Sequence, residues 1–280
     1  MGLTDKVRLD VLLVERGLAE SRQKAQALIM AGLVFVGEER LDRVAEKVPA
    51  DLQVRVKAAL PYVSRGGLKL ERALESFQMV LTDKVVADLG ASTGGFTDCA
   101  LQHGARKVYA VDVGYGQLHW KLRQDERVVC MERLNARYLT EESLPELVDV
   151  VVCDVAFISL KKIFPAMRRI LRIDGLGVIL IKPQFEAGAE KVGKKGVVRD
   201  PAVHRQVLTD VLGAAEEGGF AVEGLDVSPI AGAQGNKEFL ACLRRGEGVP
   251  KGDRERDRER DREFIDRMIA DCADWGGIVL

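Results

Sequence analysis

The chain has 280 residues, which exceeds one average domain, so we expect two domains or one large domain with an appended module. Apolar residues make up 47% of the chain and charged residues 30%, as in globular proteins that bury a sizeable core. The net charge of −1 gives no overall electrostatic attraction to nucleic acid, so any affinity for nucleic acid must come from local basic patches.

The composition also bears on location and on metals. Residues 1–8 lack the apolar core of a signal peptide, and no segment is long and apolar enough to span a bilayer. We therefore expect a cytoplasmic protein without a membrane partner. Five cysteines and three histidines are scattered without the spacing of a zinc site or a disulfide framework, which predicts reduced thiols and no metal. No pattern indicates an obligate protein partner.

Residues 1–57 predict a small α+β domain. Apolar residues at helical spacing predict a helix over residues 8–16, which ends at a glycine. A second helix begins after a serine N-cap and covers residues 21–32. Short β-branched segments at 33–36 and 53–56 are the predicted strands, and turn residues separate them.

A proline-containing linker is predicted at residues 58–63, and a larger domain follows at 64–245. Its predicted strands are Val85–Leu89, Val108–Val113, Val128–Glu132, Val148–Asp154, Gly177–Lys182, Phe220–Ile230 and Glu238–Arg244. Such continuous apolar strands, separated by helices, favour a parallel sheet that is buried on both faces. A glycine-rich turn joins the last two strands, which predicts an antiparallel hairpin at the edge of the sheet. The predicted fold class is α/β, a doubly wound, Rossmann-like sheet of about seven strands.

Residues 246–280 form a charged C-terminal extension. Residues 251–263 hold six basic and six acidic side chains in a repeating pattern. Like charges meet at i,i+4 in a helix of this sequence, so we expect a marginal, solvated helix. Residues 264–280 carry enough apolar side chains to pack against another part of the chain.

A glycine-rich segment, Asp88–Phe96, leaves the first strand of the larger domain and enters a helix. Its glycines let the backbone approach a ligand, and the helix N-terminus offers free N–H groups. The spacing is Gly-x-x-x-Gly-Gly, not that of a dinucleotide site, and Asp88 stands where it could receive the amino group of methionine. The pattern favours S-adenosylmethionine over NAD as cofactor, and a ligand-free turn remains the alternative.

Three polar residues end other predicted strands. Asp112 ends the second strand, where a carboxylate can accept hydrogen bonds from both ribose hydroxyls. Asp154 and Lys182 end the fourth and fifth strands, so we expect both side chains at the carboxyl edge of the sheet, although a purely structural ion pair remains open. The predicted cofactor-binding residues are Asp88, Gly90, Ser92, Gly94, Gly95, Phe96, Asp112 and Asn135.

Five strings occur in order along the chain: residues 63–70 (VSRGGLKL), 88–96 (DLGASTGGF), 153–159 (CDVAFIS), 181–186 (IKPQFE) and 235–239 (GNKEF). Together they resemble the TlyA family, also called haemolysin A-like, of rRNA 2′-O-methyltransferases related to the FtsJ/RrmJ enzymes. The resemblance extends from about Arg8 to Arg244 and leaves out the charged tail. It implies S-adenosylmethionine-dependent 2′-O-methylation of ribose in ribosomal RNA, with cytidine as the target nucleotide.

By this resemblance, the family's catalytic tetrad falls on Lys69, Asp154, Lys182 and Glu238. A ribose hydroxyl is a poor nucleophile and a sulfonium methyl is already activated, so catalysis must supply a base and alignment. A lysine serves as a base only where burial or a second cation favours its neutral form. We hypothesise that Lys182 takes the proton, that Lys69 favours this and holds the ribose oxygen, and that the carboxylates orient both lysines.

The N-terminal domain resembles the αL RNA-binding motif of the ribosomal-protein S-four type, carried by Arg8-Leu9-Asp10, Gly17, Ser21-Arg22 and Val34-Phe35-Val36. This resemblance implies contacts with the phosphates of folded RNA. A basic loop, Lys191–Arg199, follows the predicted active site and is a second candidate for backbone contacts, although a surface loop without this role remains open. The predicted RNA-binding residues are Arg8, Arg16, Arg22, Lys24, Arg65, Lys191, Lys194 and Lys195.

The implied partner is ribosomal RNA or a ribosomal subunit, and two other functions stay open. One is a non-catalytic RNA-binding or ribosome-assembly factor that keeps the fold, and the presence of all four tetrad residues argues against it. The other is a membrane-active haemolysin, which lacks support from any spanning or strongly amphipathic segment. A methyl-transfer assay on ribosomal subunits tests the first alternative, and lysis in cofactor-free buffer tests the second.

Overall fold

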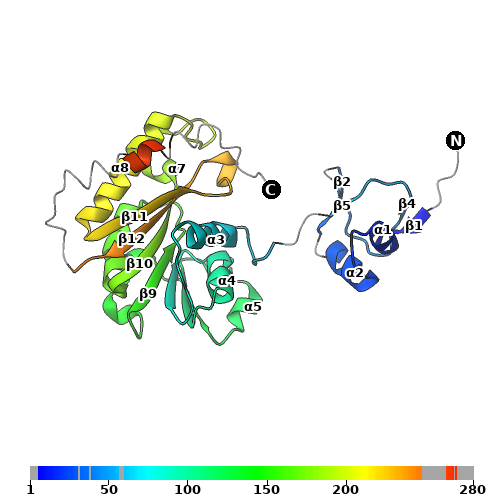
Figure 1. Cartoon of the computed structure of the whole chain (residues 1–280), viewed down its shortest axis with the longest axis horizontal. Helices are drawn as coiled ribbons and strands as arrows, with labels where there is room; N and C mark the ends of the chain where they lie inside the picture. The colour runs from blue at the N-terminus through cyan, green and yellow to red at the C-terminus, as the bar shows by residue number, and fades with distance from the viewer. Residues whose placement is uncertain are drawn as a thin grey trace. The chain divides into compact units, whose positions relative to one another are not determined.

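The computed structural model describes residues 6–30, 32–37, 39–56, 60–247, 263–267 and 269. The chain divides after Pro61 into two compact units, drawn in blue and in cyan to red in Figure 1. The predicted charged helix at 251–263 lies outside the described residues, apart from Glu263. Within the described part of the chain, no helix has the length and apolar character needed to cross a membrane.

The larger unit is a seven-stranded mixed sheet covered by helices on both faces (Figure 1). Its elements are α3 (Gly66–Ser76), β6 (Val85–Leu89), α4 (Gly95–Gln102), β7 (Lys107–Asp112), α5 (Trp120–Arg123), β8 (Val128–Glu132), η1 (Ala136–Tyr138), η2 (Glu141–Ser143), β9 (Val148–Cys153), η3 (Leu160–Lys162), α6 (Phe164–Ile170), β10 (Leu171–Ile181), α7 (Pro183–Glu186), η4 (Ala189–Lys191), α8 (Pro201–Glu217), β11 (Phe220–Val227), η5 (Ala233–Gly235) and β12 (Phe239–Arg245). The strand order is β11-β12-β10-β9-β6-β7-β8. The predicted α/β class with about seven strands is therefore confirmed.

Alternate side chains of the central strands pack on opposite faces of the sheet. In β6, Val85, Ala87 and Leu89 contact the core that includes α6 and α8, whereas Val86 faces the core that includes α3, α4 and α5. This is why these strands are apolar throughout. β12 is antiparallel to β10 and to β11, so β11 forms the edge of the sheet and the predicted antiparallel hairpin is confirmed.

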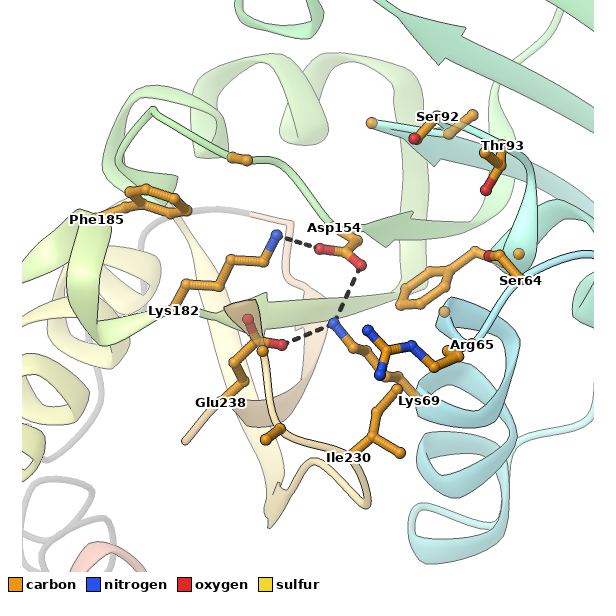
Figure 2. A pocket seen from close by; sticks show the side chains of 18 of the residues that line it. Ser64, Arg65, Lys69, Ser92, Thr93, Asp154, Lys182, Phe185, Ile230 and Glu238 are labelled. Atoms are coloured by element: carbon orange, nitrogen blue, oxygen red, sulfur yellow. Dashed lines mark hydrogen bonds and ion pairs between the residues drawn. The ribbon is translucent and has the colours of Figure 1, made fainter. Parts of the chain in front are cut away.

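Glycines allow close packing where the chain leaves the strands. Gly90 follows β6 with a positive φ of 87°, and a Cβ there would lie 2.7 Å from the backbone oxygen of Asp154. The turns after β6 and β9 therefore touch each other, which brings strand-end residues together at the carboxyl edge of the sheet. Figure 2 shows this edge, with Asp154 after β9, Lys182 after β10 and Glu238 before β12.

The described part of the C-terminal extension packs on the larger unit. Residues 263–267 are helical, and Ile265 is only 2% exposed in the core that includes α8. Asp266 forms an ion pair with Arg205 of α8. Ile265 and the partly buried Ile269 therefore pack against this unit.

The smaller unit combines two helices with short strands. Its elements are β1 (Lys6–Arg8), α1 (Leu9–Glu15), α2 (Arg22–Met30), β2 (Val34–Val36), β3 (Glu39–Arg40), β4 (Lys47–Pro49) and β5 (Arg55–Val56). β1 pairs with β4, and β2 lies between β3 and β5. The helices and the strands β2 and β5 agree with the prediction, whereas β1, β3 and β4 were not predicted. β1, β3 and β4 hold charged residues or proline, whereas the predicted strands lie in segments rich in β-branched residues.

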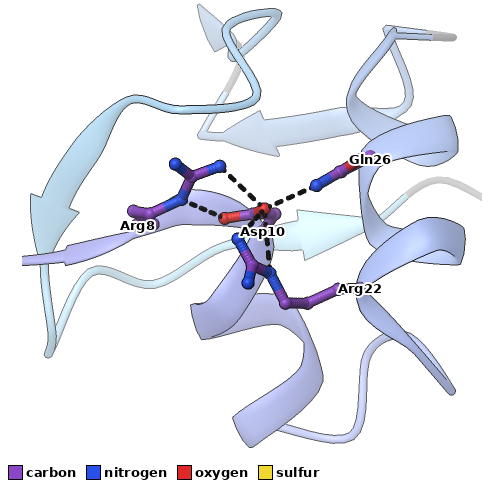
Figure 3. A network of polar contacts seen from close by, with 4 residues as sticks. All are labelled: Arg8, Asp10, Arg22 and Gln26. Atoms are coloured by element: carbon purple, nitrogen blue, oxygen red, sulfur yellow. Dashed lines mark hydrogen bonds and ion pairs between the residues drawn. The ribbon is translucent and has the colours of Figure 1, made fainter.

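A buried carboxylate joins the two helices of this unit (Figure 3). Asp10 of α1 has no exposed surface and accepts hydrogen bonds from Arg8 at 2.9 and 3.0 Å. Arg22 of α2 donates to the same carboxylate at 3.1 and 3.2 Å, and Gln26 donates at 2.9 Å. Chiefly because of Arg8, the pKa of Asp10 lies well below its usual range.

We expect Asp10→Ala to destabilise the smaller unit by about 1–3 kcal/mol, because two guanidinium groups lose a buried acceptor. Hydrogen exchange of the amides in α1 and α2 of the full chain measures the loss. The exposed Asp51→Ala is the control and should change stability by less than about 0.5 kcal/mol.

Because the folded pKa of Asp10 is lowered, its stabilising effect is present above its unfolded pKa, about 3.9, and is lost as pH falls through the folded value. The stability difference between the wild type and Asp10→Ala should therefore be full at neutral pH and shrink in acid. A difference that stays constant from neutral to strongly acidic pH would argue against this ion-pair network.

Candidate active site

Two adjoining cavities lie at the carboxyl edge of the larger unit's sheet. The first, named the tetrad cavity, has a volume of about 430 Å³ and is lined by Ser64, Arg65, Gly66, Lys69, Gly90, Ala91, Ser92, Thr93, Gly95, Phe96, Asp154, Ala156, Phe157, Lys182, Gln184, Phe185, Ile230, Ala231, Gly232 and Glu238. The second, named the Asp112 cavity, has a volume of about 680 Å³. The two share Gly90, Ser92, Asp154, Ala156 and Phe157. A ligand in one cavity can therefore reach a ligand in the other.

The four predicted tetrad residues meet in the tetrad cavity (Figure 2). The Nζ atom of Lys182 lies 2.5 Å from Oδ1 of Asp154, and Oδ2 of Asp154 lies 3.6 Å from Nζ of Lys69. Nζ of Lys69 also donates a hydrogen bond to Oε2 of Glu238 at 2.7 Å. The side chains therefore form a chain in which positive and negative charges alternate.

This chain of charges is largely shielded from water. The exposed fractions of the side chains are 11% for Lys69, 19% for Asp154, 12% for Lys182 and 2% for Glu238. Burying an unpaired charge is costly, but here two amines face two carboxylates and the group is neutral. Lys69 contacts two carboxylates, whereas Lys182 contacts one. The two amines are therefore not equivalent.

The Asp112 cavity presents a carboxylate held by the backbone. Oδ2 of Asp112 accepts a hydrogen bond from the N–H of Ser92 at 2.8 Å, and Oδ1 accepts one from Gly114 at 2.7 Å. Asn135 lines the same cavity and caps η1 through its side-chain oxygen. Apolar side chains complete the wall: Val111, Val113, Leu134, Val155, Ile158 and Ile163. An oriented carboxylate beside apolar walls fits a nucleoside, with the ribose hydroxyls on the carboxylate.

Two predicted cofactor residues line neither cavity. Asp88 is fully buried, and burial raises its pKa to about 7. One of its oxygens accepts a hydrogen bond from Thr97 of α4 at 2.7 Å, so Asp88 anchors the helix beneath the turn. Gly94 has a φ of 96°, and a Cβ there would lie 2.3 Å from Leu122. The other oxygen of Asp88, Oδ1, is buried and has no hydrogen-bond partner in the described part of the chain. A contact of Asp88 with the methionine end of the cofactor therefore stays a prediction, whereas Gly94 packs against α5.

The predicted RNA-binding residues fall into two groups. Arg8, Arg16 and Arg22 are engaged within the smaller unit: Asp10 binds two of them, and Arg16 donates to backbone oxygens of residues 50 and 52 at 2.5 Å each. A role of these three in binding phosphate stays a prediction, and Asp10 or backbone oxygens already accept part of the donors of each guanidinium group. The others are exposed: Lys24, Arg65, Lys191, Lys194 and Lys195.

An aromatic pair at the tetrad cavity was not predicted from the sequence. Phe157 is 89% exposed and has a positive φ of 63°, which is unusual for an aromatic residue. Its ring centroid lies 5.0 Å from that of Phe185. Glu186, next to Phe185, accepts hydrogen bonds from Ser159 and from the N–H of Leu160, and so holds the two aromatic segments together. Both segments lie in strings that carried the family resemblance, which was the available signal.

No group of three or more potential metal-binding side chains gathers in the described part of the chain. Two of the histidines have structural roles instead. His204 is buried and bonded to the backbone oxygen of Val198, and His119 caps α5.

Comparisons with known proteins agree with this geometry. Residues 62–245 match the FtsJ-like methyltransferase family, and residues 7–54 match the S4 domain. The chain is 56% identical over 249 residues to YqxC of Bacillus subtilis, which carries an rRNA methyltransferase name; the match covers 87% of this chain and 88% of that protein.

Two further relatives support the same assignment. The Mycobacterium tuberculosis 16S/23S rRNA (cytidine-2′-O)-methyltransferase TlyA is 44% identical over 246 residues, which cover 85% of this chain and 90% of that protein. A solved structure from Streptococcus thermophilus, named a haemolysin, is 44% identical with a TM-score of 0.71, over 98% of this chain and 100% of that one. The chain therefore belongs to the TlyA/haemolysin A-like family of rRNA methyltransferases, with an FtsJ-like catalytic domain and an S4 domain.

Proposed function

We propose that this protein transfers the methyl group of S-adenosylmethionine to a ribose 2′-hydroxyl of ribosomal RNA, with a cytidine as the target. The observation that carries the proposal is the alternating chain of Lys182, Asp154, Lys69 and Glu238 in a cavity that adjoins the Asp112 cavity. The cytidine follows the name of the M. tuberculosis relative. Such a substrate is found in the cytoplasm, as free rRNA or in ribosomal subunits.

The Asp112 cavity is the proposed place of the cofactor. Asp112 would accept hydrogen bonds from its ribose hydroxyls, and the apolar wall would contact its adenine ring. Gly90 and Ser92 line both cavities, so the reactive end of the cofactor would face Asp154 and the tetrad. The bound cofactor supplies a methyl group that its sulfonium charge has already activated. The chain's own residues must then align the ribose and remove its proton.

The two lysines take different roles in the proposed mechanism. Lys69 is held by two carboxylates, and its amine would contact the ribose oxygen as negative charge develops there. Lys182 is held by Asp154 alone, and its Nζ, when neutral, accepts the proton of the 2′-hydroxyl. Asp154 orients both amines, and Glu238 orients Lys69 from the other side.

The RNA is held by surfaces outside the tetrad. The S4 match supports RNA binding by the smaller unit, where the exposed Lys24 and the partly exposed Arg22 are the proposed phosphate contacts. At the tetrad cavity, Arg65 adds a cation and the exposed ring of Phe157 offers a flat face on which a nucleobase can stack.

We expect Lys182→Ala to lower kcat for methyl transfer by about 10²–10⁴-fold, the usual contribution of a general base. Lys182→Arg keeps a cation beside Asp154 but cannot accept a proton, so it should be equally inactive. Methyl incorporation into ribosomal subunits measures the rate, and calorimetry should show that binding of S-adenosylmethionine changes little. Lys161→Ala, an exposed lysine outside both cavities, is the matched control. Substantial turnover by Lys182→Arg would refute the base assignment.

We expect Asp112→Asn to weaken binding of S-adenosylmethionine about 10–100-fold, because hydrogen bonds to a charged acceptor contribute about 1.5–3 kcal/mol. Isothermal calorimetry with the cofactor alone measures this change without any RNA. Asp125→Asn removes a carboxylate outside both cavities and should leave the affinity unchanged. Unaltered affinity in Asp112→Asn would place the cofactor elsewhere.

A further inference from the structure

A compact basic turn follows the tetrad residue Lys182 in the chain. Residues 191–199 contain Lys191, Lys194, Lys195 and Arg199 and no acidic residue, and all four cations are exposed. The N–H of Gly196 donates to the oxygen of Gly193 at 2.8 Å, and the N–H of Gly193 donates to the oxygen of residue 197 at 3.1 Å. These bonds close a turn with Lys194 and Lys195 at its tip.

The base of this turn is fixed by one buried side chain. Asn236 is 2% exposed, and its Oδ1 accepts a hydrogen bond from the N–H of Val198 at 3.0 Å. Its Nδ2 donates to the oxygen of Gly196 at 2.9 Å. Val198 is itself 2% exposed and packs in the core. The two lysines are therefore carried by an anchored structure, so their position relative to the sheet is defined.

The segment that contains Asn236 also forms a wall of the tetrad cavity. Ile230 and Glu238, labelled in Figure 2, and Gly232 all line that cavity. The N–H of Gly232 donates to the backbone oxygen of Asn236 at 2.9 Å, which closes the segment. A Cβ at residue 232 would lie 2.0 Å from Oε1 of Glu238, so this backbone packs directly on the tetrad carboxylate. Asn236 thus connects the basic turn with the segment that carries Glu238.

We propose that the turn at residues 193–197 is a clamp for the phosphate backbone of the RNA, and that Asn236 is its positioning residue. This inference rests on the proposed function and adds to it a surface that binds substrate. Lys194 and Lys195 attract phosphates of the RNA backbone. Asn236 fixes the position of the two lysines relative to the tetrad. A phosphate bound to the turn therefore places a neighbouring ribose at the tetrad cavity. A contact to phosphate is independent of sequence, so the clamp positions the RNA and leaves nucleotide choice to the cavity.

The lysines are tested by the salt dependence of RNA binding. Each phosphate neutralised by a cation contributes about 0.7–0.9 to the slope of log K against log salt. Lys194→Gln with Lys195→Gln should therefore lower the magnitude of the slope by about 1.4–1.8. Binding to purified small and large ribosomal subunits is measured over a range of salt concentrations. The control is Lys84→Gln with Arg106→Gln, which removes two exposed cations before β6 and β7, at the opposite end of the sheet. A slope equal to that of the wild type would overturn the clamp.

The positioning role of Asn236 is tested by its dependence on the lysines. Asn236→Ala should raise KM for the RNA by about 10-fold, the change expected from losing one or two phosphate contacts, while S-adenosylmethionine affinity stays within about twofold. In the Lys194→Gln, Lys195→Gln background the same substitution should change KM by less than about twofold, because the displaced cations are already absent. Equal effects in both backgrounds would reduce Asn236 to a general structural role and overturn the proposal.

A second variant guards against simple loss of folding. Asn236→Ser keeps a neutral polar side chain but removes the amide that donates to the oxygen of Gly196, so it should loosen the turn and raise KM for RNA while the thermal transition changes less than in Asn236→Ala. An unchanged KM would contradict the positioning role of Asn236. Failure of the proposed function is recognised separately, because the wild type would then methylate neither ribosomal subunit.

Discussion

Asp154 is the residue on which the site depends, because its two oxygens contact the amines of two different lysines. Without it, Lys182 loses its only carboxylate in the tetrad, and Lys69 retains only Glu238. The resulting group would be cationic in a place that is largely shielded from water, which is unfavourable. The shared carboxylate thus allows two amines to lie close together beside a substrate oxygen, which is what the proposed proton transfer requires.

The sheet explains how residues so far apart in the chain reach this carboxylate. β6, β9 and β10 are parallel neighbours, so their carboxyl ends share one edge, where Gly90, Asp154 and Lys182 follow the three strands. β12 runs in the opposite direction and therefore begins at the same edge, where Glu238 precedes it. Only Lys69 comes from a helix, α3, which packs on one face of the sheet. The topology of the sheet therefore places three of the four tetrad side chains at this edge.

The basic side chains of the two units differ in whether they form ion pairs within the protein. In the smaller unit, Asp10 binds Arg8 and Arg22, which stabilises the two helices and leaves fewer donors for a phosphate. In the larger unit, the basic turn at residues 193–197 is organised through backbone and amide bonds, so its lysine amines are not used for folding. With a net charge of −1, the protein depends on such local groups for any attraction to RNA.

The sequence by itself determined the strands of the larger unit and the glycine turn, and it indicated the four residues that meet in the tetrad cavity, since apolar runs, glycine spacing and family strings are local patterns along the chain. The carboxyl ends of the parallel strands β6 to β10 could be predicted to within one residue, and so could the side chains at that edge, whereas β10 begins six residues before its predicted start. Only the tertiary structure decided that Asp88 lies beneath the turn, that Asp10 engages two arginines, that Phe157 lines the tetrad cavity, and that Asn236 holds the basic turn. Whether a side chain is buried or forms an ion pair depends on the residues that the folded chain places around it. Those residues are distant in the sequence, so local sequence patterns do not reveal them.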